Sequence, residues 1–107
     1  MSLGPKTTAL IDILERSASL LRNHDEDDWA SWLESDRALL ERGDFNGVTH
    51  FLSAFGGMGS LNDVTLIASN GHVLAVVDAD RITATLRTLL SQGYDLAKAI
   101  SREAAVE

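Results

Sequence analysis

The sequence predicts an α+β fold that is mostly helical, with three N-terminal helices, a glycine-rich loop, a β-hairpin and a long C-terminal helix. Apolar residues recur at helical spacing in the first half of the chain and again toward its C-terminus. Between these regions, two β-branched runs flank Asn70-Gly71, a dipeptide that favours a tight hairpin turn. At 107 residues the chain suits a single domain over 1–107, with disorder expected at 1–4 and 103–107.

Residues 5–23 are predicted to form an amphipathic helix. Pro5 suits the first helical position, because the N–H group that proline lacks would have no helical partner there. Five later residues follow the three- and four-residue spacing of one helix face and are expected in the core: Leu10, Ile13, Leu14, Ser17 and Leu21.

A second helix is predicted from Asp25 to about residue 42, with Gly43 ending it. Asp25 and Asp28 have the spacing of a capping box, and the carboxylates of "DEDD" lie near the positive end of the helix. The expected buried stripe has one polar member, Asp36. Its other members are Trp29, Trp32, Leu33, Leu39 and Leu40.

A third, shorter helix is predicted after Asp44, whose carboxylate can cap it. Gly56 falls where a helix often ends on a left-handed residue. Four apolar residues line one side of this helix: Val48, Phe51, Leu52 and Phe55.

The predicted hairpin lies within "VTLIASNGHVLAVV". Ser60 and Asp63 also have capping-box spacing, so a helix over 61–69 stays open as an alternative, although the β-branched run favours a strand. Both faces of the hairpin are apolar and one layer of helices covers only one face, so a second copy of the chain is expected on the other, as a homodimer. A two-residue turn pairs Ser69 with His72, Ile67 with Leu74 and Thr65 with Val76.

The helical period returns from about Asp80 and predicts a long last helix that frays from Arg102. Gly93 interrupts this pattern at a cost of about 1 kcal/mol relative to alanine. It either allows another helix to approach closely or marks a kink. The residues expected to face inward are Ile82, Leu86, Leu89, Leu90, Ala97 and Ile100.

Composition restricts the classes of function. The net charge of −7 argues against nucleic acid, because a phosphate backbone is bound by clustered lysines and arginines. The absence of cysteine excludes disulfides and thiolate metal sites. No apolar run approaches the ~20 residues of a membrane span, and no signal-peptide pattern is present, so a cytoplasmic location without membrane contact is expected.

The glycine-rich stretch "FGGMGSLND", residues 55–63, has two interpretations. As a structural device, its glycines allow tight turns and its small polar side chains bond nearby backbone groups. As a binding loop, it would present backbone amides and polar groups to a ligand, although a P-loop is excluded because no lysine lies within it. The candidate ligand-binding residues are Gly57, Gly59, Ser60, Asn62, Asp63 and His72.

The remaining polar and aromatic candidates have plain structural interpretations. A metal or acid–base site would require His50, Asp63 and His72 to converge, whereas solvated histidines are the default. Trp29 and Trp32 can form a ligand platform, but at helical spacing on an apolar stripe they are expected in the core. No catalytic residue, cofactor or metal is therefore predicted.

The sequence resembles a family of small uncharacterised bacterial proteins. The shared signature is "GGMGS" followed by Phe or Leu and "ND", here Gly56 to Asp63, and then "NGH", here Asn70 to His72. The resemblance extends to the pattern around Leu86 to Ala97, and it implies no known activity. It does imply that the loop and the "NGH" corner belong to one recurring unit.

These observations favour a small acidic protein-interaction module, of an immunity or regulatory kind, that binds a protein partner and is not an enzyme. The alternative is a small-ligand binder or enzyme with its site at the loop between Gly56 and Asp63. The two hypotheses differ in whether the polar groups of that loop converge on an open pocket.

Overall fold

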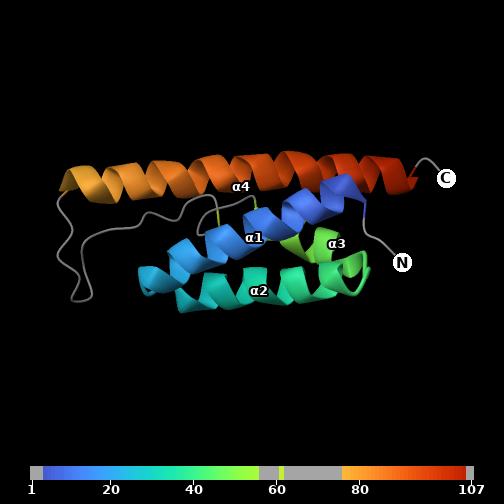
Figure 1. Cartoon of the computed structure of the whole chain (residues 1–107), viewed down its shortest axis with the longest axis horizontal. Helices are drawn as coiled ribbons and strands as arrows, with labels where there is room; N and C mark the ends of the chain where they lie inside the picture. The colour runs from blue at the N-terminus through green and yellow to red at the C-terminus, as the bar shows by residue number, and fades with distance from the viewer. Residues whose placement is uncertain (1–3, 56–60, 62–75, 106–107) are drawn as a thin grey trace.

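The computed structural model describes residues 4–55, 61 and 76–105, and these form four helices. In chain order they are α1 (Pro5–Asn23), α2 (Asp27–Glu41), α3 (Asn46–Leu52) and α4 (Val76–Ala105). The long helix α4 runs along one side, α2 lies on the opposite side, and α1 crosses between them in contact with both (Figure 1). The short helix α3 packs on α2 and α4.

Helix α1 has the predicted bounds and the predicted core face. Pro5 occupies its first turn after Gly4, and the five residues predicted inward are all buried. The helix ends at Asn23, and the chain reverses through Asp25, whose φ of 65° is in the left-handed region that aspartate tolerates better than most residues.

Helix α2 begins two residues later than predicted. The expected N-cap is wrong: the N-cap residue is Glu26, which makes no side-chain cap hydrogen bond, and Asp25 precedes the helix with a left-handed backbone. Asp27 and Asp28 still lie in the first turn, where the helix dipole favours negative charge. The predicted end is confirmed at Gly43, which has a φ of 74°.

Asp44 connects α2 to α3. Its Oδ1 atom accepts a hydrogen bond from the Asn46 backbone N–H group at 2.9 Å, as predicted for a capping residue. Beyond α3, the backbone N–H of Leu61 donates to the Ala54 carbonyl at 2.9 Å, and the Leu61 side chain is fully buried. Leu61 therefore ties the chain after α3 to the same core.

The predicted α+β class is wrong for the part of the chain that the structure describes, where four helices and no strand are present. Val76 and Val77, expected at the end of the second hairpin strand, belong to the first turn of α4. Helix extension explains this difference, since each residue added to an existing helix gains a hydrogen bond and fixes only its own backbone. The remainder of the expected hairpin, with Asn70-Gly71, lies outside the described residues.

Gly93 marks the point where α1, α3 and α4 meet. A Cβ atom at this position would lie 3.1 Å from Ile13 Cγ2 and 3.2 Å from Phe51 Cζ. Of the two predicted explanations for this glycine, the close approach of another helix is therefore confirmed. None of the helices described has the length and apolarity needed to cross a membrane.

Replacing Gly93 by valine is expected to lower the melting temperature. The added methyl groups overpack a full core at a cost of about 1–3 kcal/mol, which corresponds to about 4 °C or more in a domain of this size. Ser91→Val, at an exposed position of α4, controls for the helix propensity of valine. Equal melting temperatures for the two variants would contradict the close approach.

Candidate functional site

The most unusual side chain of the core is Asp36, in the middle of α2. It is 0% exposed and lies among leucines of the same helix face. An ionised carboxylate is too strongly hydrated to be buried without a partner. Asp36 therefore defines a place where the fold must supply a donor.

His50 of α3 supplies that donor. Its Nδ1 atom is hydrogen bonded to Asp36 Oδ1, while its side chain is 43% exposed. An ionised carboxylate only accepts hydrogen bonds, so in that state Nδ1 carries the hydrogen and donates it. The second ring nitrogen of His50, Nε2, takes no part in this hydrogen bond and is the nitrogen to which another group can bind.

The loss of hydration that Asp36 suffers on burial is only partly offset by its hydrogen bond with His50. Burial raises the pKa of Asp36 to about 6, and the hydrogen bond and charge of His50 act in the opposite direction. Its second oxygen, Oδ2, is buried and has no hydrogen-bond partner among the described residues. Ionised Asp36 thus depends on one hydrogen bond, where a carboxylate can accept several.

Two tryptophans extend the pair into a row of aromatic rings. The Trp32 ring stacks on the His50 ring, with centroids 4.1 Å apart and planes 15° apart. Trp29 lies against Trp32 at 5.5 Å with a tilt of 55°. We call Trp29, Trp32 and His50 the aromatic row. Both tryptophans are half-buried and pack on the core, so they lie between the two predicted roles of core residue and platform.

Gly47 allows α3 to lie close enough for this arrangement. A Cβ atom at Gly47 would lie 2.9 Å from the backbone oxygen of Asp36 and 2.9 Å from Leu40 Cγ. Because His50 follows Gly47 by three residues, the two share one face of the helix. The glycine therefore sets the spacing at which His50 reaches Asp36.

The aromatic row begins beside a cluster of carboxylates. Residues 25–28, which we call the acidic turn, directly precede Trp29 and consist of Asp25, Glu26, Asp27 and Asp28. Arg22 pairs with this turn at 3.4 Å from Asp27, and it also binds Glu34 at 2.6 Å. The four carboxylates make the segment that begins α2 acidic.

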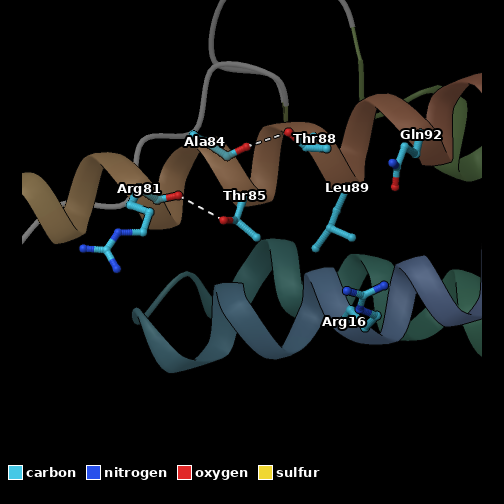
Figure 2. Close-up of a pocket in the computed structure, with 7 residues that line it drawn as sticks. All are labelled: Arg16, Arg81, Ala84, Thr85, Thr88, Leu89 and Gln92. Carbon is cyan, nitrogen blue, oxygen red and sulfur yellow. Dashed lines mark hydrogen bonds between the residues drawn. The ribbon is translucent and has the colours of Figure 1, made fainter.

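A hollow of about 460 Å³ lies on the other side of α1, against α4 (Figure 2). Much of its polar lining is engaged in hydrogen bonds or ion pairs within its own helix. Thr85 and Thr88 donate to backbone carbonyls one turn earlier, and Arg16 lies 3.6 Å from Asp12. The hollow therefore offers no convergent chemistry comparable with the Asp36–His50 pair. Its lining is Arg16, Arg81, Ala84, Thr85, Thr88, Leu89 and Gln92.

The predicted ligand-binding residues all fall outside the described part of the chain: Gly57, Gly59, Ser60, Asn62, Asp63 and His72. Of the histidine-based site predicted from His50, Asp63 and His72, the structure describes His50 alone and places it on Asp36. Among the described residues, no group of three potential ligands is positioned for a metal ion.

Sequence reasoning missed the pairing of Asp36 with His50 and the role of Gly47. One signal was available, because Asp36 is the polar interruption in an otherwise apolar stripe. A buried carboxylate requires a cationic or donor partner, and His50 is the one titratable side chain of α3.

Residues 22–75 match a family model described as "Domain of unknown function (DUF6966)", and the chain belongs to this family. The matched range contains the acidic turn, the aromatic row, Asp36 and Gly47. The predicted resemblance to an uncharacterised family is confirmed at this level. No curated protein matches the chain, and no solved structure matches it either.

Replacing Gly47 by alanine is expected to destabilise the protein although alanine is the better helix former. The overlap with the Asp36 carbonyl costs about 1–3 kcal/mol, whereas helix propensity returns about 1 kcal/mol. Thermal unfolding measures the difference, and Thr49→Ala at an exposed position of α3 is the control. A melting temperature for Gly47→Ala at or above that of the unmodified chain would rule out the close approach.

The raised pKa of Asp36 predicts a specific dependence of stability on pH. Its value in the folded protein is about 6, against about 3.9 for an unfolded chain, so the folded state binds more protons between these values. The contribution of Asp36 to the free energy of unfolding is therefore largest below about pH 4, falls as the pH rises to about 6, and is constant above.

Urea unfolding at pH 4, 5, 6 and 7 measures this contribution. In Asp36→Asn the fall between pH 4 and pH 6 is expected to be absent. Asp28→Asn, at an exposed position in the first turn of α2, should retain the fall. If both variants keep the slope of the unmodified protein, Asp36 does not titrate in this range.

Proposed function

We propose that this protein is a protein-interaction module that binds a basic segment of a partner protein on the acidic turn and the aromatic row. The observation that carries the proposal is their juxtaposition, in which a partly exposed row of rings continues directly from four carboxylates. We place this activity in the cytoplasm, since a chain without cysteine suits a reducing compartment.

The chemistry of the surface suits arginine and lysine side chains. Tryptophan gives the strongest cation–π attraction of the aromatic residues, and it is enriched at the centres of protein interfaces. The acidic turn adds electrostatic attraction at the edge of the same surface. A guanidinium can thus contact an indole while a neighbouring basic side chain pairs with a carboxylate.

The charge of the whole chain supports the same class of partner. A net charge of −7 attracts a basic segment over a distance of about a Debye length and accelerates its encounter. It repels nucleic acid for the same reason. The predicted homodimer, whose argument depended on the hairpin, gains no support from the described residues and stays a prediction.

Fluorescence titration tests the proposal directly, because the chain has two tryptophans and both belong to the aromatic row. A short arginine-rich peptide is expected to change the emission in a saturable manner, and a glutamate-rich peptide of equal length is not. Added salt should weaken the binding, since the attraction is partly between exposed charges.

Variants locate the binding surface. Trp29→Leu is expected to weaken binding of the arginine-rich peptide about tenfold, because it removes an aromatic contact worth about 1.4 kcal/mol. The matched control is Tyr94→Leu, which removes an exposed aromatic ring from α4. The proposal fails if the peptide does not bind at low salt, or if the two variants bind it equally.

A further inference from the structure

We infer that the Asp36–His50 pair makes this surface sensitive to protons: on acidification the pair takes up one proton, and the loss of its negative charge beside Trp32 weakens the hold on a basic segment. The effect on a partner rests on the proposed function. The proton uptake itself is a property of the free protein.

The geometry of Asp36 identifies the atom that receives the proton. Oδ1 is occupied by the hydrogen bond from His50, whereas Oδ2 is buried without a hydrogen-bond partner in the part of the chain that the structure describes. Among those residues, His50 is the group whose hydrogen bond and charge oppose protonation of Asp36. Burial favours the neutral acid and raises the pKa of Asp36 toward the physiological range.

Other charges around the pair are engaged elsewhere. On α2, Arg37 pairs with Glu41 at 3.0 Å and lies 3.9 Å from Glu15 of α1. The other charged groups of α1 also pair at the surface, and α3 carries no titratable side chain except His50. Of the described residues, those of α4 included, His50 alone acts on Asp36 through its charge.

Stacking transmits the change to the binding surface. The His50 ring lies in contact with the Trp32 ring, and Trp32 precedes Asp36 by one helical turn. A change in the charge of the pair therefore takes place next to the indole that a basic side chain would approach. One unit charge at contact distance in water changes an affinity roughly fivefold.

The first experiment follows the emission of Trp32 in the free protein from pH 8 to pH 5, in a Trp29→Phe background. Because the charge of the pair changes beside the Trp32 ring, the emission is expected to change on acidification. Adding Asp36→Asn should remove this change, and adding His50→Gln should shift its midpoint to higher pH, because His50 stabilises the ionised carboxylate. Adding His24→Gln, which changes the histidine after α1, should leave the change unaltered.

Circular dichroism establishes that each variant is folded. Emission that is flat between pH 8 and pH 5, or a change that persists in Asp36→Asn, overturns the inference.

The second experiment measures the affinity for the arginine-rich peptide at pH 7.5 and pH 5.5. The unmodified protein and His24→Gln should bind roughly fivefold more weakly at the lower pH, and Asp36→Asn should lose most of this difference. Binding that is equal at both pH values overturns the inference and leaves the proposed function intact. The absence of binding at both values overturns the proposed function and, with it, the control of a partner.

Discussion

The structure depends on one constraint, the burial of a carboxylate in the middle of α2. Asp36 is fully enclosed, so the helix that packs there must bring a hydrogen-bond donor to a defined point. Helix α3 meets this requirement with His50, and it comes close enough because position 47 has no side chain. The turn through Gly43 and Asp44 connects the two helices and sets the direction in which α3 packs on α2.

The helical part of the fold was predictable because the sequence signals for helices, apolar spacing and terminal residues, are periodic and local. The bounds of α1, the end of α2 at Gly43 and the cap at Asp44 all follow from signals within a few residues. The hairpin prediction used equally local signals, but at Val76 and Val77 the chain is already in α4, where helical hydrogen bonding overrides them. For the site, the sequence indicates only that Asp36 needs a donor, because a contact between residues 36 and 50 depends on the angle between two helices.

The acidic turn and the aromatic row are connected by the way α2 begins. A helix start favours carboxylates in its first turn, and this preference explains the charge of Asp27 and Asp28. It does not explain why two tryptophans follow immediately and remain half-exposed, since their core-facing neighbours are leucines and alanine. The structural role of the carboxylates and a binding role for the combined surface are therefore compatible.

Stability alone gives a poor account of the Asp36–His50 pair. A buried ionic pair loses hydration that its mutual attraction only partly restores, and apolar residues of similar size often join two elements at least as well. Here the loss is larger, because Oδ2 has no hydrogen-bond partner within the described ranges and His50 is 43% exposed to water that competes for its charge. An apolar contact would hold α3 on α2 without these losses, but it would not respond to protons. The arrangement is thus better explained by a change of charge beside Trp32 than by the joining of two helices.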